Sequence, residues 1–276
     1  MKFQQPVISV NELNEILDNP NLVILDCSID KVGKKLDDLD IQLIPNSHFF
    51  DIEHRFSDHR SELPHTLVDD KIFTKEAQLL GIDMDSIIIC YDRWGVYSSP
   101  RAWWMFKTMG FKEVYVLNGG IIAWKNANYP TSKTYQIPEN LGNFEAHLDE
   151  NWLANVNDVL DAIDHVETKI VDARSAARFN AEVDEPRAGL RKGHIKNAGN
   201  IPFELVLNED FLKTDDELSE IFRKYNDKDE LIFSCGSGVT ASILALANHQ
   251  VNPNQMIKVY DGSWSEWGKD PELPIE

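Results

Sequence analysis

The two halves of this 276-residue chain repeat one another. Matching residues recur at one constant offset of 143 positions: Gly95 with Gly238, Gly119 with Gly262, and Trp124 with Trp267. This period is far longer than the ~20–50 residues of a solenoid repeat, so it indicates a duplicated domain. The chain is also long enough for two domains of ordinary size.

Short apolar segments alternate with helical ones in both halves. Val23–Asp26, Ile87–Tyr91 and Val114–Leu117 have the pattern of strands, and Ser98–Met109 carries apolar residues at helical spacing. In the second half, Lys169–Asp172 ends in aspartate as Val23–Asp26 does. Strands that alternate with helices predict an α/β fold, with a mostly parallel central sheet flanked by helices in each half.

A polar stretch separates the two repeats. Residues 131–143 lack a clear period and contain Pro138 and Gly142, which is typical of a linker. We therefore expect a first domain over residues 1–133, a linker over 134–150 and a second domain over 151–276.

Cys235 stands at the most informative point of the second repeat. It follows the apolar segment Ile232–Ser234 and precedes Gly236, Gly238 and a helix of small and apolar residues. Loop N–H groups and a helix N-terminus both favour an anion, so they favour a thiolate over a thiol. The offset of 143 places Asp92 at this position in the first repeat, and a carboxylate cannot carry sulfur. We expect the first domain to be catalytically silent.

Composition excludes several classes of function. With 27 basic against 46 acidic residues the net charge is −19, which argues against nucleic-acid and anionic-membrane partners. No secretory signal and no apolar run of ~18 residues is present. The three cysteines, Cys27, Cys90 and Cys235, are too few and too scattered for a disulfide scaffold or structural zinc. We expect Cys27 and Cys90 to be core residues, and the protein to be cytoplasmic.

The repeat with one cysteine loop resembles the two-domain rhodanese-like sulfurtransferases. The resemblance covers nearly the whole chain and includes three motifs: Trp103-Trp104, Asp172-Ala173-Arg174 and Tyr260-Asp261-Gly262-Ser263-Trp264. The fold it implies is two tandem rhodanese-like domains. The loop from Cys235 to Ala241 looks like that of members acting on 3-mercaptopyruvate, because Gly236 and Ser237 stand where thiosulfate-specific members tend to carry basic residues.

The resemblance implies sulfur transfer through a persulfide on Cys235. Cysteine suits this role because its thiolate is strongly nucleophilic. The loop backbone and the following helix would stabilise the sulfur anion. We therefore expect the backbone of four residues to take part in substrate binding: Gly236, Gly238, Val239 and Thr240. Ser237 belongs to the family's catalytic group, and its hydroxyl can bond the thiolate or relay a proton. No metal or organic cofactor is needed.

Arg178 and Arg187 are the expected ligands of a substrate carboxylate. Both follow the strand that ends at Asp172, and loops at the carboxyl ends of strands build the sites of α/β proteins. The guanidinium group suits bidentate carboxylate binding, and the resemblance assigns both positions to the substrate. A salt bridge to Glu182, Asp184 or Glu185 is the structural alternative. Arg174 is expected to pair with a carboxylate.

The resemblance further implies that a first-domain segment completes the site with an acid and a histidine. By position these are Glu53 and His65. Glutamate stands where some relatives have aspartate, and the spacing of this segment varies among them. Other histidines lie nearby in the sequence: His48, His54 and His59.

Competing functions require residues or donors that differ from these. A phosphatase of the Cdc25 type needs an arginine about six positions after its cysteine, where this chain has Ala241. A thiosulfate:cyanide sulfurtransferase shares the mechanism and differs in the donor. A non-enzymatic sulfur carrier or interaction module is the third alternative. The expected reaction takes sulfur from 3-mercaptopyruvate, a small anionic keto acid, to cyanide, a small thiol or a thioredoxin-like protein, and releases pyruvate.

Overall fold

The computed structural model describes residues 3–31 and 33–276, which form two compact units. The first unit runs to Asp58 and continues over Leu67–Asp149 and Glu209–Leu212. The second unit comprises His59–Thr66, Glu150–Asn208 and Lys213–Glu276. Each unit therefore contains one short segment from the other half of the chain.

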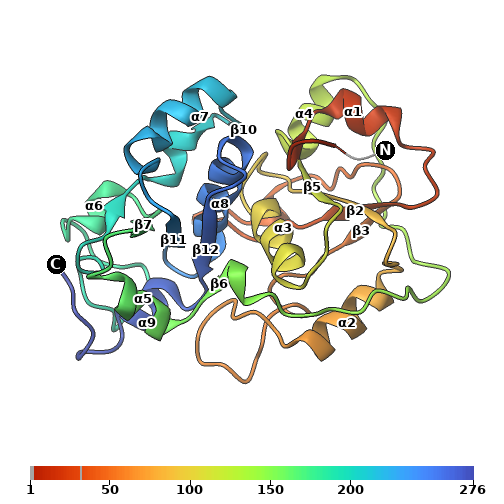
Figure 1. The fold of residues 1–276 in the computed structure, drawn as a ribbon. Coiled ribbons are helices and arrows are strands. Elements are labelled where there is room, and N and C mark those ends of the chain that lie inside the picture. Colours follow the sequence, from red (N-terminus) through yellow and green to blue (C-terminus); the bar gives the residue numbers. More distant parts are fainter. Residues whose placement is uncertain (1–2, 32) are drawn as a thin grey trace. The chain divides into compact units, whose positions relative to one another are not determined.

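The first unit is built on a five-stranded parallel sheet (Figure 1). The strands follow the order β1-β5-β4-β2-β3: Val7–Ile8, Val114–Leu117, Ile87–Tyr91, Leu22–Asp26 and Ser47–Phe49. The helices are α1, η1, α2, α3 and α4: Val10–Glu15, Leu36–Asp38, Asp70–Leu79, Ser99–Thr108 and Gly120–Asn126. The predicted α/β fold is confirmed in this half.

The second unit repeats that topology. Its parallel sheet has the order β6-β12-β11-β7-β8: Leu153–Ala154, Met256–Tyr260, Glu230–Ser234, Thr168–Asp172 and Gly199–Asn200. The helices are α5 to α9: Val156–Ala162, Ala176–Phe179, Asp215–Phe222, Val239–Val251 and Ser263–Trp267. Shorter elements of this unit are η2, η3, η4 and β9: Glu150–Trp152, Phe203–Val206, Arg223–Tyr225 and Leu207–Asn208. The short strand β10, Phe211–Leu212, belongs to the segment that is grouped with the first unit.

Burial on both faces of the sheets explains why their strands are continuous apolar runs. Every residue of β4 is buried, as are Leu231–Ser234 of β11. Parallel sheets are covered by helices on both faces, so their central strands lack the alternation of polar and apolar residues. Cys90 on β4 and Cys27, the residue after β2, are fully buried, as expected of core residues. Burial, and next a hydrogen bond with Cys90, raise the pKa of Cys27 well above its usual range.

Residues 134–149 of the expected linker are grouped with the first unit. Within that segment, Phe144 and Ala146 are buried, and the ring of Phe144 packs against Phe73 and Phe111 with centroids 6.4 and 5.0 Å away. Although this segment is mostly polar, two of its apolar side chains are therefore buried. Among the described residues, no helix is long and apolar enough to cross a bilayer.

Candidate functional site

The Cys235 loop lies at the carboxyl end of β11, the middle strand of the second sheet. Cys235 follows the last strand residue directly and is 2% exposed. Helix α8 begins at Val239, and its N-cap Gly238 has a φ of +79°, a left-handed conformation that glycine adopts without side-chain strain. The loop is thus a tight turn that leads into the N-terminus of a 13-residue helix, whose first N–H groups lack helical acceptors.

Ser263, the first residue of α9, braces this loop from the segment that follows the neighbouring strand β12. Its Oγ accepts the N–H groups of Cys235 and Gly238 at 3.2 and 3.1 Å and donates to the carbonyl of Tyr260 at 2.7 Å. The next turn adds two bonds, from the Trp264 N–H to the Cys235 carbonyl at 2.9 Å and from the Ser265 N–H to the Gly236 carbonyl at 3.0 Å. These bonds hold both ends of the loop without using the cysteine sulfur.

Two arginines from the segment after β7 lie near the loop. A side-chain carbon placed on Gly236 would come within 3.2 Å of Arg178 Nη2 and 3.8 Å of Arg187 Nη1. The structure therefore brings both predicted arginines within one side chain of the residue after Cys235. The missing side chain at Gly236 leaves this space open.

Glu185 orients one of these arginines. Its carboxylate accepts hydrogen bonds from Arg178 Nε and Nη2 at 3.2 and 2.5 Å, so the predicted alternative of a salt bridge is realised for Arg178. The Arg178 side chain is still 22% exposed, which leaves part of its guanidinium group accessible. Arg187 is exposed and has no ion-pair or hydrogen-bond partner in the part of the chain that the structure describes.

Arg174 has a structural role, as expected. It is buried, bonds both oxygens of Asp172 at 2.6–3.1 Å and donates to Glu185 at 2.8 Å. Its guanidinium carbon lies 4.2 Å from the centre of the Trp264 ring. Because Arg174 and Arg178 share Glu185, the buried network also fixes the position of Arg178.

The remaining predicted residues of the loop lie at the start of α8. Ser237 is 9% exposed, and its hydroxyl has no hydrogen-bond partner among residues 3–31 and 33–276. Val239 and Thr240 form the first turn of the helix, where their backbone N–H groups are available to an anion. The Ser237 hydroxyl is therefore available to a reactant at the loop.

The two first-half candidates fall into different units. His65 belongs to the segment His59–Thr66 of the second unit, the unit that holds Cys235, and has a left-handed φ of +60°. Glu53 belongs to the first unit, where burial, and next the charge of Asp30, raise its pKa above the usual range. The histidine is thus grouped with the cysteine loop and the glutamate is not.

The Asp92 loop of the first unit has the same position in its sheet but a different occupant. Asp92 is fully buried, and its Oδ2 accepts three backbone hydrogen bonds of 2.8–3.0 Å, from Tyr97, Ser98 and Ser99. The Ser99 hydroxyl adds a bond of 2.7 Å to the same oxygen, and Oδ1 accepts the Trp94 N–H at 2.9 Å. A built-in carboxylate thus fills the anion cradle of this loop.

Two contributors to the site were absent from the sequence-based expectations for its catalytic and binding residues. Glu185 was considered only as a neutralising partner, and Ser263 only as part of a family motif. The sequence does contain a feature that distinguishes Ser263, because the 143-residue offset pairs it with Gly120. A hydroxyl side chain thus replaces a glycine within a closely matched stretch. No comparable signal distinguishes Glu185 from the adjacent acidic residues.

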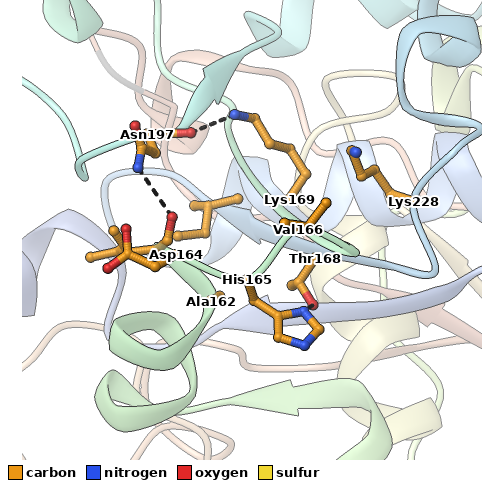
Figure 2. Close-up of a pocket in the computed structure, with 10 residues that line it drawn as sticks. Ala162, Asp164, His165, Val166, Thr168, Lys169, Asn197 and Lys228 are labelled. Atoms are coloured by element: carbon orange, nitrogen blue, oxygen red, sulfur yellow. Dashed lines mark hydrogen bonds between the residues drawn. The ribbon is translucent and has the colours of Figure 1, made fainter.

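A separate pocket opens at the opposite end of the second sheet (Figure 2). It has a volume of about 350 Å³ and surrounds the amino end of β7. Lys169 Nζ donates to the Asn197 carbonyl at 2.5 Å, and Asn197 Nδ2 donates to the Ile163 carbonyl at 3.2 Å. Two of its polar side chains are thus bonded to backbone carbonyls, and none of the predicted site residues lines it. In the described residues no group of histidine, cysteine and acidic side chains is arranged to hold a metal.

Comparisons with known proteins agree with this architecture. Residues 9–127 and 155–270 match the family model described as "Rhodanese-like domain". The 3-mercaptopyruvate sulfurtransferase of Escherichia coli K12 is 42% identical over 278 residues, covering 98% of this chain and 97% of the relative. The crystal structure of SseA from Escherichia coli, a 3-mercaptopyruvate sulfotransferase, matches with a TM-score of 0.82 and 38% identity over 95% of this chain and 100% of its own. The Tum1 protein of Saccharomyces cerevisiae matches with a TM-score of 0.86 and 27% identity over 99% and 98% of the two chains.

Proposed function

Because the chain belongs to the rhodanese-like family, we propose that it is a 3-mercaptopyruvate sulfurtransferase that works through a persulfide on Cys235. One observation carries the proposal. Cys235 lies just before a helix N-terminus, and the guanidinium groups of Arg178 and Arg187 approach the adjacent Gly236, which has no side chain. A nucleophile, an anion cradle and a carboxylate clamp are the three parts that this reaction needs. The activity in the names of full-length relatives supports the same conclusion.

The substrate carboxylate is bound by Arg178 and Arg187. Glu185 holds Arg178 in one orientation, while Arg187 is free to close on the bound keto acid. Two guanidinium groups give bidentate contacts that a lysine would not, which favours a planar carboxylate next to a ketone. The backbone at Gly236, Gly238, Val239 and Thr240 completes the binding surface around the reacting sulfur.

Sulfur transfer begins with attack by the Cys235 thiolate on the thiol sulfur of 3-mercaptopyruvate. A new S–S bond forms, the C–S bond breaks, and its electron pair stays on carbon as the enolate of pyruvate. The proton of the attacked thiol passes to that carbon, which gives pyruvate and leaves the persulfide as its anion. The loop N–H groups and the start of α8 stabilise the terminal sulfur anion of the persulfide until an acceptor takes it.

Ser237 is the proposed proton-relay residue nearest the reacting atoms. Its hydroxyl, two residues from Cys235, has no protein partner in the described structure and is free to bond the enolate or the thiolate. His65 is the proposed second member, because its segment is grouped with the unit that contains the loop. Glu53 is retained as the family's acidic counterpart and has weaker support, since it is grouped with the other unit.

The proposed acceptors are cyanide, a small thiol or the thiol of a thioredoxin-like protein. All three are nucleophiles that attack the outer sulfur of a persulfide and regenerate the Cys235 thiolate, so the cycle is a double displacement. A reducing compartment, most simply the cytoplasm, suits a protein whose Cys27, Cys90 and Cys235 are all unpaired.

Thiosulfate is the competing sulfur donor. A dianionic donor would benefit from cations within the cysteine loop, and this loop has Gly236 and Ser237 there. The nearby guanidinium groups still attract thiosulfate, so we expect a weak side activity. A higher kcat/KM for thiosulfate than for 3-mercaptopyruvate would overturn the donor assignment.

The test combines steady-state kinetics with both donors and intact-mass measurement after exposure to donor alone. The wild-type protein should gain the mass of one sulfur atom and release pyruvate, whereas Cys235→Ser should do neither. Cys90→Ala is the matched control, because it removes a buried thiol from the other sheet and should leave the persulfide in place. A wild type that gains no sulfur, or a Cys235→Ser variant that still gains it, would refute the mechanism.

A further inference from the structure

The first unit contains a pocket of about 350 Å³ beside the Asp92 loop. Eleven residues line it: Lys31, Lys34, Leu39, Asp40, Gln42, Arg93, Trp94, Ile121, Ile122, Lys125 and Asp210. All of them belong to the first unit, Asp210 through the segment Glu209–Leu212. We propose that this pocket binds a small organic anion, a carboxylate or a phosphate ester, that carries an apolar body.

The charge of the pocket is opposite to that of the chain. Four cationic side chains line the pocket, Lys31, Lys34, Arg93 and Lys125, against the carboxylates of Asp40 and Asp210 in the lining and of Asp26, which pairs with Arg93. This local excess of positive charge occurs in a chain with a net charge of −19. Clustering like charges in a concave site is unfavourable unless a counter-charge occupies it, so the arrangement favours an anionic ligand.

Three of the cations remain available to such a ligand. Lys34 and Lys125 are exposed and make no ion pair with any residue in the described ranges. The Lys31 ammonium lies 4.9 Å from the centre of the Tyr97 ring, which positions it without neutralising it. These three ammonium groups therefore lie at the pocket without a carboxylate partner among the described residues.

Arg93 supplies a rigid edge to the same pocket. Its side chain is only 10% exposed and donates from Nε to Asp26 at 3.0 Å and from Nη2 to the Tyr135 hydroxyl at 2.5 Å. Its remaining terminal nitrogen, Nη1, makes no hydrogen bond within the described part of the chain. A fixed, largely buried guanidinium group with one free donor is a preorganised feature of a binding site.

Apolar side chains provide a floor for the body of the ligand. Trp94 is 9% exposed, and its indole N–H donates to the Ile29 carbonyl at 2.8 Å, which fixes the ring. Ile121 and Ile122 line the same pocket from helix α4, and Leu39 lines it from the segment after η1. Small-molecule sites combine such an apolar lining with a few fixed polar groups.

The duplication explains why an anion site occurs at this place. Lys31 and Lys34 follow β2 as Arg178 and Arg187 follow β7, so both units direct cations to the carboxyl end of the sheet beside the loop. In the first unit Asp92 fills the cradle, so the ligand is bound without sulfur transfer. Lysine acts as a point charge and discriminates less between anion shapes than arginine does. The proposed site therefore accepts both carboxylates and phosphate esters, and its binding is independent of the proposed activity.

The experiment uses benzoate and phenyl phosphate, which share an aromatic body and differ in the anionic group. Two-dimensional NMR of the full-length, ¹⁵N-labelled protein follows the indole N–H signals, with that of Trp94 assigned from a Trp94→Phe variant. We expect a saturable shift of the Trp94 signal with at least one probe at a Kd of about 1 mM or tighter. The probe with the lower Kd shows whether the site prefers a carboxylate or a phosphate ester.

Charge variants test whether the lysines cause the binding. The double variant Lys34→Ala/Lys125→Ala should weaken binding about tenfold or more, because two uncompensated charges are lost. The matched control Lys71→Ala/Lys112→Ala removes two other exposed lysines of the first unit and should leave the Kd unchanged. Asp210→Asn removes a repelling carboxylate and should tighten binding. The proposal is overturned if neither probe gives a saturable shift up to ~10 mM, or if the double variant binds as the wild type does.

Discussion

The Asp92 loop and the Cys235 loop solve the same structural problem in opposite ways. In both, a central parallel strand ends and a helix begins within a few residues. Asp92 occupies its loop from inside, where its carboxylate accepts four backbone N–H bonds and one hydroxyl bond. The Cys235 loop is held from outside by Ser263, whose hydroxyl accepts the N–H groups of Cys235 and Gly238 and leaves those of Val239 and Thr240 at the helix start available to an anion.

A second pair of residues shows the same exchange. Gly120 and Ser263 occupy equivalent positions and share a φ of +49°. A side chain on Gly120 would approach the Asp92 carbonyl oxygen to 2.2 Å, so the first unit tolerates none there. In the second unit the serine side chain fits and becomes the brace. The two units thus share the backbone conformation at this position, while side chains decide which loop is closed by an internal anion and which stays open to an external one.

The largest expected effect comes from removing the internal anion. Asp92→Asn replaces a fully buried carboxylate with a neutral amide that cannot accept all five hydrogen bonds. We expect the free energy of unfolding of the first unit to fall by about 3–5 kcal/mol. Urea denaturation followed by fluorescence and circular dichroism measures this loss.

The Cys235 loop provides the control for that experiment. Cys235→Ala should change the free energy of unfolding by about 1 kcal/mol or less, since no hydrogen bond of the loop depends on the sulfur. Equal stability of Asp92→Asn and wild type would show that the internal carboxylate does not hold its loop together.

Next in size is the effect of the free arginine. Arg187→Ala should raise the KM for 3-mercaptopyruvate about 10–100-fold with kcat little changed, because it removes a charge-assisted contact to the substrate carboxylate. Arg223→Ala is the matched control, since Arg223 is exposed and pairs with Glu220 at 2.7 Å in the same unit. An unchanged KM in Arg187→Ala would remove this residue from the substrate site.

A smaller effect should follow when the second loop receives the residue of the first. Ser263→Gly leaves the N–H groups of Cys235 and Gly238 without their acceptor, while glycine readily adopts the φ of +49°. We expect kcat to fall about 5–10-fold, corresponding to ~1–1.4 kcal/mol, with little loss of folded protein. In the control Ser265→Ala, the Gly236 carbonyl keeps its backbone donor, so the loss should be smaller. Equal kinetics of Ser263→Gly and wild type would contradict the bracing role.

The smallest predicted difference concerns the edge strands of the two sheets. His48 lies on β3, whereas the corresponding strand β8, Gly199–Asn200, carries no titratable side chain. Burial lowers the pKa of His48, and its Nδ1 lies 2.9 Å from the Gln136 carbonyl. A histidine with a lowered folded pKa contributes its full stability above the ordinary value of 6.5, and this contribution is lost as the pH falls through the folded pKa.

Melting temperatures of wild type and His48→Gln between pH 8 and pH 5 measure this effect. The stability of the wild type relative to the variant should decrease as the pH falls below about 6.5. A relative stability that rises on acidification would contradict a lowered pKa of His48 in the folded protein.

Local patterns in the sequence determined much of the fold and part of the candidate site. The strands Ile87–Tyr91 and Val114–Leu117 have the predicted bounds, because a buried parallel strand is a continuous apolar run that neighbouring residues alone reveal. The glycines that follow Cys235 likewise indicate a tight turn before a helix. The internal repeat by itself identifies Asp92 as the counterpart of Cys235.

Tertiary structure alone decided how the two loops are held. Ser263 lies 28 positions from Cys235 and reaches it because β11 and β12 pair in parallel, which brings their carboxyl ends together. The choice of Glu185 among several acidic neighbours, the grouping of His65 with the second unit, and the gathering of Lys31, Lys34 and Lys125 around one pocket are of the same kind. Each depends on contacts between segments distant in the chain, and hydrophobic periodicity within a segment carries no information about such contacts.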